Sequence, residues 1–469
     1  MVIRHDGLHI PSEAPFLNCK LDRSQYAEVL TTVINTYSEG FVLAINGSWG
    51  CGKTTFVKMW QASIANTHKT IYFNAWENDF DNEPLTALLG EFKSIIPDQS
   101  KFTPVIEKAA TFAKYIIPTI ADIVAKHYFN GTPIVDVIHK ASEASAEIFE
   151  EETKKYLEKK KGITEFKVEL SKFVNEQIKV KPLVVFIDEL DRCRPDYAIE
   201  VLEKIKHFFS IPGIVFVLSI DKVQLGHAVE GYYGSSKINS TEYLRRFVDL
   251  EFKLPMPNTR SFVEYLYGHF QFNDLFNLRQ GHGERDEFII FCSEHYSYFN
   301  YSLRQQEKQL AHLRIVLQSM KNQKYLFPKV IIILAHLKEY KNELYEKIKS
   351  LSMPIDKLLV EYNSVFAELL RMETNKKRFV KSYLSSLAQI IILYNNSLFR
   401  KQLSDIYISD LLIKRDTHSP FELSFNTLVF DHTLQQNLIS LIDQQRYNLL
   451  DDEIQIIFDK IELTEHFTY

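Results

Sequence analysis

One short stretch near the start of the chain combines glycines, a lysine and a hydroxyl residue at a fixed spacing. It reads Gly47-Ser48-Trp49-Gly50-Cys51-Gly52-Lys53-Thr54 and is followed by Thr55. Glycines let the backbone turn tightly, so that successive N–H groups can converge on one anion. In such a loop Lys53 would reach the β- and γ-phosphates of a nucleotide, and the Thr54 hydroxyl would ligate Mg²⁺. The stretch therefore predicts binding of a magnesium-bound nucleoside triphosphate. We take ATP as the default nucleotide, because no residue spacing indicates a different base.

The residues on either side of this loop predict the elements that must hold it. Five apolar residues, Phe41–Ile45, indicate a buried strand before the loop, and a helix is expected from the loop to about Ala65. A strand, a glycine-rich turn and a helix together direct backbone N–H groups and the positive helix end at one site. The alternative is a glycine-rich turn that merely precedes an ordinary helix.

A second group of polar residues follows the apolar run Leu183–Ile187 and begins with Asp188-Glu189-Leu190-Asp191. Asp188, at the tip of a buried strand, is expected beside Thr54 as a metal anchor. Either Glu189 or Asp191 can take the proton from an attacking water, and we favour Glu189. The alternative is that these acids only pair with Arg192 and Arg194 in a solvated turn.

Two further places could complete the site. Ser219 and Asp221 end the next predicted strand, Ile214–Leu218, where either side chain could sense the γ-phosphate or hold the water. Arg245 and Arg246 precede a fifth predicted strand, 247–254, from which an arginine could reach the γ-phosphate of a neighbouring subunit. That idea makes a homo-oligomer possible, and a pair of surface arginines is the alternative.

The order of elements predicts an α/β core interrupted by helices. An irregular arm is expected at 1–20, and the core at 21–96 and 182–257, with another strand at 70–75. A helical insert is expected between the two core segments, at 97–181. After a Pro-Met-Pro boundary the apolar spacing is helical, which predicts a lid at 258–327 and a C-terminal helical domain at 328–469.

Composition limits the class of protein. The 469 residues include 60 acidic and 55 basic ones, so no overall positive charge indicates nucleic acid. Four widely spaced cysteines form no C-x-x-C pair, which argues against a zinc site and for a reducing, cytoplasmic setting. The longest charge-free run, Ser382–Phe399, carries too many polar residues for a membrane span.

Taken together, the motifs resemble the KAP family of P-loop NTPases. The resemblance covers about residues 20–320 in the right order: the loop with its Trp49, FNAW at 73–76, DELDRCRP at 188–195, LSIDK at 218–222, YLRRFVDLEFKLP at 243–255 and YSLRQQEK at 301–308. It implies an ASCE-type three-layer core, with an extra strand between the two Walker strands and the parallel sheet order 5-1-4-3-2. It also implies that Arg304 acts as a sensor arginine from the helical lid. Bacterial members without membrane spans include ATPase subunits of phage-exclusion systems such as the Qat type, which makes antiviral defence an expectation.

Three functions follow from these motifs. The first is an ATP hydrolase that serves as a nucleotide-driven switch or motor subunit of a larger protein complex. The second is a nucleotide-locked scaffold that scarcely turns over. The third is a small-molecule phosphotransferase, against which we weigh the lack of a convincing basic lid motif.

Overall fold

The computed structural model describes residues 10–80, 83–116, 144–178, 182–206, 208, 210–234, 238–256, 258–276, 284–321, 326–370, 377–404 and 453–463. The chain divides into two compact units, Arg4–Met256 and Pro257–Tyr469, and each is described by itself. The predicted division of the second unit at residue 327 stays a prediction.

The first unit is built on one parallel sheet. Its strands are β1 (Phe41–Asn46), β2 (Thr70–Asn74), β3 (Leu183–Asp188), β4 (Ile214–Ile220) and β5 (Leu250–Lys253). They lie in the order β2-β3-β4-β1-β5, and every neighbouring pair is parallel. The predicted order 5-1-4-3-2 is confirmed, because it is the same order taken from the opposite edge. The fifth strand is shorter than predicted, since Phe247 is buried in a 3₁₀ turn (η3) over Arg245–Phe247.

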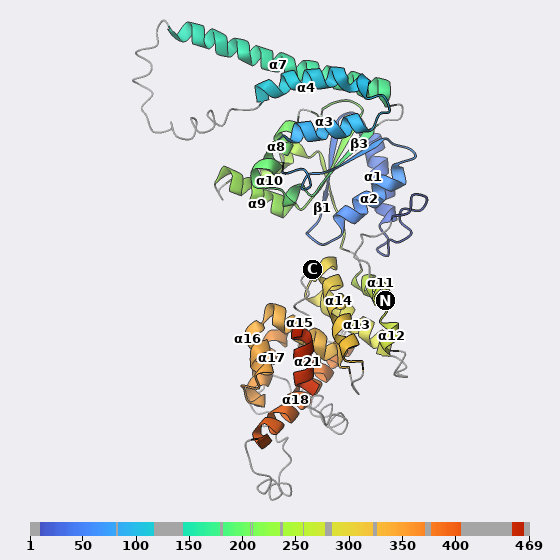
Figure 1. Cartoon of the computed structure of the whole chain (residues 1–469), viewed down its shortest axis with the longest axis vertical. Helices are drawn as coiled ribbons and strands as arrows, with labels where there is room; N and C mark the ends of the chain where they lie inside the picture. The colour runs from blue at the N-terminus through green and yellow to red at the C-terminus, as the bar shows by residue number, and fades with distance from the viewer. Residues whose placement is uncertain are drawn as a thin grey trace, which may run out of the picture. The chain divides into compact units, whose positions relative to one another are not determined.

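Helices cover both faces of this sheet, which gives three layers (Figure 1). Successive strand residues point to opposite faces, so Leu43 and Ile45 pack into one apolar cluster and Val42 and Ala44 into another. The first cluster includes residues of α1 (Ser24–Thr36) and α2 (Lys53–Ile64), and the second includes residues of α3 (Pro84–Ser94), α8 (Pro195–Ile205) and α9 (Lys222–Tyr233). A short α10 (Ser240–Leu244) precedes the η3 turn.

The predicted insert contains two packed helices. They are α4 (Thr103–Ile116) and the much longer α7 (Ala144–Gln177), which lie side by side above α3 (Figure 1). Phe102, in a 3₁₀ turn before α4, contacts Phe173 of α7 with ring centroids 4.8 Å apart. Residues 117–143 of this insert lie outside the described residues.

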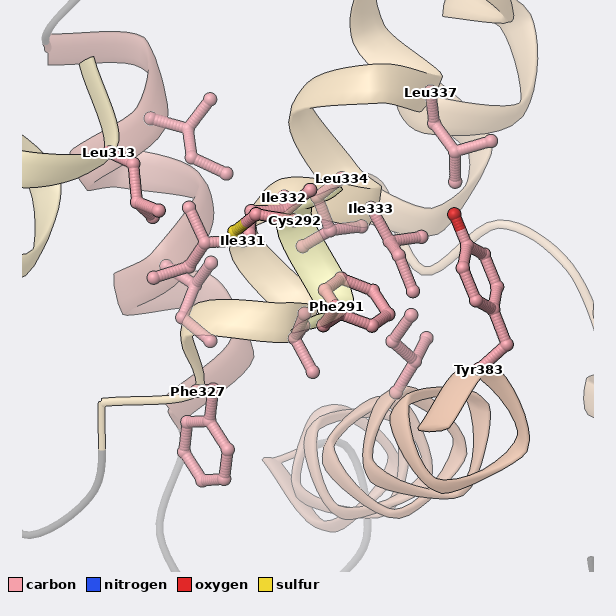
Figure 2. Packing of buried hydrophobic residues seen from close by; sticks show 14 of the residues in the cluster. Phe291, Cys292, Leu313, Phe327, Ile331, Ile332, Ile333, Leu334, Leu337 and Tyr383 are labelled. Carbon is pink, nitrogen blue, oxygen red and sulfur yellow. The ribbon is translucent and has the colours of Figure 1, made fainter. Parts of the chain in front are cut away.

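The second unit is helical throughout its described part. Its helices are α11 (Thr259–His269), α12 (Asn273–Phe276), α13 (Glu284–Tyr298), α14 (Leu303–Ser319), α15 (Pro328–Tyr340), α16 (Asn342–Lys349), α17 (Ile355–Leu370), α18 (Lys377–Ser404) and α21 (Glu453–Leu463). Figure 2 shows part of its core, in which Phe291 of α13, Ile333 of α15 and Tyr383 of α18 converge. The predicted C-terminal domain also includes 405–452 and 464–469, which lie outside the described residues.

Within the described ranges, none of the helices combines the length and apolar content that a membrane crossing requires.

Candidate functional site

The glycine-rich loop joins the end of β1 to the start of α2, as the sequence predicts. Gly50 and Gly52 have φ angles of +75° and +82°, which side chains other than glycine rarely adopt. Gly47 is needed for a different reason, because a Cβ there would lie 2.7 Å from the Sγ atom of Cys51. Backbone geometry and close packing thus both require glycines in this loop.

Lys53 and Thr54 open α2 directly after the loop. The Nζ atom of Lys53, a buried side chain, donates to the carbonyl oxygen of Gly47 at 2.6 Å and lies 3.4 Å from that of Ser48. The Thr54 hydroxyl lies 3.4 Å from Oε1 of Glu189, at the end of β3. The two predicted motifs, 135 residues apart in the chain, therefore meet at one place.

Asp188 ends β3 as a buried carboxylate with both oxygens engaged. Oδ2 accepts a hydrogen bond from the Tyr72 hydroxyl at 2.9 Å, and Oδ1 accepts one from the backbone N–H of Glu189, also at 2.9 Å. Burial and the adjacent Asp188 carboxylate raise the pKa of Tyr72, which keeps its hydroxyl a donor. Asp188 is therefore held in a fixed orientation at the carboxyl edge of the sheet.

Glu189 has a left-handed backbone with φ of +61°, and its side chain contacts three neighbours. Besides Thr54, its Oε1 accepts from Arg192 at 2.9 Å, and its Oε2 lies 3.4 Å from the amide nitrogen of Asn74. The Arg192 guanidinium also lies 5.6 Å from the centroid of the half-exposed Trp76 ring. The ion pair between Glu189 and Arg192, which the sequence left as an alternative, therefore exists. It lies beside Thr54, at the start of α2.

Asp191 lies close to the loop through Trp49. The indole Nε1–H of Trp49 donates to Oδ2 of Asp191 at 2.5 Å, while the Trp49 backbone N–H donates to Oδ2 of Asp221 at 3.1 Å. Burial raises the pKa of Asp191, although the nearby charge of Lys53 and the bond from Trp49 act to lower it. Oδ1 of Asp191 has no hydrogen-bond partner within the described part of the chain.

Ser219 and Asp221 flank the end of β4. Ser219 is fully buried and pairs in register with Asp188 on one side and Ile45 on the other. Its hydroxyl has no partner among the residues that the structure describes. Asp221 also caps α9, because its Oδ1 accepts from the backbone N–H groups of Val223 and Gln224.

Two predicted site residues of the first unit are not brought to the loop. Arg245 and Arg246 are both exposed in the η3 turn, and the Arg245 guanidinium pairs with Glu242. In the described ranges, neither arginine contacts the loop, and an action on the γ-phosphate of a neighbouring subunit stays a prediction. Arg304 is exposed in the first turn of α14, in the second unit, and its role as a sensor stays a prediction.

Three residues found at this site were given no role there from the sequence, although one of them, Asn74, lies within the FNAW stretch. Tyr72 and Asn74 lie on β2, next to β3, and their position at a strand end was the available signal. Arg23, just before α1, donates to the carbonyl oxygens of Cys51 at 2.7 Å and Gly52 at 3.0 Å. It belongs to no motif, so only the fold shows its contact with the loop.

These residues fit a magnesium-bound nucleotide. The glycine loop opens a twelve-residue helix, whose N-terminal N–H groups attract phosphate. Thr54 and Asp188 supply oxygen ligands of the type that Mg²⁺ prefers. The buried, unpartnered oxygens of Ser219 and Asp191 lie at the same edge of the sheet, where bound water or ligand groups would satisfy them.

Comparison with known proteins gives limited likeness over the whole chain. The phage T7 exclusion protein of Escherichia coli K12 is 23% identical over 233 residues, which are 46% of this chain and 30% of the relative. An uncharacterized protein of Methanocaldococcus jannaschii is 36% identical over 85 residues, or 18% of this chain and 41% of the relative. The chain therefore spans less than half the length of these two curated relatives.

Two solved structures also resemble the chain weakly. The ORC2 protein of Aeropyrum pernix, in ADPNP and ADP complexes, gives a TM-score of 0.34 at 16% identity and covers 98% of each chain. A DNA replication initiation factor gives 0.30 at 13% identity and covers 94% of this chain and 99% of its own. TM-scores this low carry no argument about the present chain.

The family comparison, in contrast, covers more than half of the chain and includes every motif residue of the first unit. The model of the KAP family P-loop domain matches residues 23–321, from just before α1 to just past α14. The five-stranded parallel sheet and the glycine loop have the architecture that this match requires. The chain belongs to the KAP family of P-loop NTPases.

Proposed function

We propose that the protein binds ATP with Mg²⁺ in the Gly47–Thr54 loop and hydrolyses it. The observation that carries this proposal is the 3.4 Å approach of the Thr54 hydroxyl to the Glu189 carboxylate. That approach puts a metal-ligand hydroxyl and a candidate base at one end of one sheet, beside the loop that would hold the phosphates.

Each side chain has a distinct role in this proposal. Lys53 would neutralise the β- and γ-phosphates, and Thr54 and Asp188 would hold the magnesium ion, which would supply positive charge to the transferring phosphoryl group. Glu189 takes the proton from the attacking water. The bond from Tyr72 keeps Asp188 in place, and the amide of Asn74 orients Glu189.

A nucleotide-locked scaffold is the second candidate. It is supported by the ion pair between Glu189 and Arg192, because a carboxylate oxygen bound to a guanidinium is less free to accept a proton. In both cases we propose that nucleotide state is passed to protein partners through the second, helical unit. The similarity to a phage exclusion protein supports a role in antiviral defence.

Binding and hydrolysis must be measured separately to test this proposal. We expect Glu189→Gln to bind Mg-ATP in calorimetry with wild-type affinity and to release phosphate about 100-fold more slowly, within the usual range for loss of a general base. Lys53→Ala should lose binding itself, since the phosphate charge loses its partner.

Asp191→Asn is the control matched to Glu189→Gln. It removes the carboxylate of the second candidate base and keeps the size of its side chain. Normal turnover in Glu189→Gln together with loss in Asp191→Asn would transfer the role of base to Asp191. A wild-type protein that binds Mg-ATP but releases no phosphate would support the scaffold, and an absence of heat with Mg-ATP or Mg-GTP would refute nucleotide binding.

A further inference from the structure

A buried arginine lies behind the glycine loop. Arg23 is only 3% exposed, and its two terminal nitrogens donate to the carbonyl oxygens of Cys51 and Gly52. One of them also lies 3.5 Å from the carbonyl oxygen of Pro255, which follows β5 after Leu254. The guanidinium thus connects the loop to the last segment of the first unit.

The positions of these bonds matter because a peptide group is planar and trans. In such a group the C=O and the N–H point in opposite directions. The carbonyl of Cys51 shares its peptide with the N–H of Gly52, and the carbonyl of Gly52 shares its peptide with the N–H of Lys53. A group that fixes these two carbonyls behind the loop therefore fixes the two N–H groups toward its phosphate-binding side.

The charge of Arg23 is not balanced by a neighbouring acid. In the ranges that the structure describes, no carboxylate is among the charged groups that act on its guanidinium, and its Nε has no hydrogen-bond partner. Burial lowers the pKa of Arg23 from its ordinary value, which reflects the cost of desolvating this cation. A polyphosphate bound in the loop is an anion whose charge would offset part of this cost.

We propose that Arg23 is a positioning residue for phosphate binding, which orients the N–H groups of Gly52 and Lys53 and adds a buried positive charge behind them. The inference rests on the proposed nucleotide binding. It adds one residue from outside the loop to the residues that hold the phosphates. Arg23 touches backbone carbonyls of the loop, so it affects how tightly phosphate is held rather than the proton transfer at Glu189.

The test compares Arg23→Met and Arg23→Lys with the wild type in calorimetry with Mg-ATP and Mg-ADP. We expect Arg23→Met to weaken both affinities by about tenfold or more, the usual worth of a hydrogen bond to a charged group. Arg23→Lys keeps the charge but loses the two-pronged geometry, so its loss should be smaller, about threefold. In steady-state hydrolysis, KM should rise while kcat stays within about twofold of wild type.

A second buried arginine provides the matched control. Arg314, in α14 of the helical unit, is 4% exposed and donates from Nε to the carbonyl oxygen of Phe270 at 2.8 Å. Arg314→Met should lower the free energy of unfolding without changing nucleotide affinity. This comparison separates a general effect of losing a buried arginine from an effect on the loop.

The outcomes distinguish this inference from the proposed function. If the wild type binds Mg-ATP and a folded Arg23→Met variant binds it within twofold, the inference on Arg23 is wrong and the proposed function stands. If Arg23→Met does not fold, Arg23→Lys decides by the same criterion. If the wild type binds no nucleotide, both fail together, because there is no phosphate to position.

Discussion

Replacing Gly47 by alanine tests how tightly the phosphate loop is packed. The added Cβ would lie 2.7 Å from the Sγ atom of Cys51, whereas an ordinary contact begins near 3.4 Å. The thiol or the loop must therefore move by roughly 0.7 Å. Cys51 is 1% exposed, so its thiol cannot swing into solvent, and overpacking of this kind costs about 1–3 kcal/mol.

We expect this strain to appear mainly as lost nucleotide affinity. A displaced loop no longer points its N–H groups at one phosphate, and about 1.4 kcal/mol corresponds to a tenfold change in the dissociation constant. Gly47→Ala should therefore bind Mg-ATP about tenfold to 100-fold more weakly in calorimetry. Gly90→Ala in α3 is the matched control, because a Cβ there meets nothing within 4 Å. It should leave affinity unchanged and stabilise the fold by about 1 kcal/mol against urea.

A double substitution identifies the cause. Cys51→Ala removes the sulfur that the new Cβ would strike, so the Gly47→Ala and Cys51→Ala double variant should recover most of the affinity. The Cγ atom of Lys53 should not prevent recovery, because at 3.4 Å from the added Cβ it is at ordinary contact distance. An affinity of Gly47→Ala within twofold of wild type, or an equal loss with and without the sulfur, would refute this reasoning.

Two further predictions concern the ion pair between Glu189 and Arg192 and the buried side chain of His336. Arg192→Gln should raise basal hydrolysis about fivefold, since it frees Oε1 of Glu189 from a partly exposed ion pair. Arg194→Gln, which removes the side-chain contacts with Asp79, should not. Burial lowers the pKa of His336 from 6.5 to about 4, so the unfolded chain binds a proton more readily and stability should fall by about 3 kcal/mol as pH drops from 6.5 to 4. His336→Gln should reduce that slope in urea titrations at several pH values, and an unchanged slope would contradict the assignment.

Local patterns in the sequence were enough to predict the sheet. The run Leu183–Ile187 is apolar at every position, as a strand buried on both faces must be, and it forms the body of β3. The loop Gly47–Thr54 was predicted because its positive-φ glycines and its lysine are required by local geometry and charge. The fifth strand was predicted too long, because the burial of Phe247 arises from packing in a turn and not from strand pairing.

The contacts between distant segments were decided only by the tertiary structure. The sequence placed Glu189 at a strand end but left its partners open, and the fold brings it to Thr54, Arg192 and Asn74. Arg23 carries no motif at all, since its role depends on backbone carbonyls that any residues could supply. The sequence by itself thus determined the nucleotide loop and the parallel sheet, which are set by spacing along the chain. Only the folded chain decided which side chains face that loop, because packing alone brings together residues so far apart in sequence.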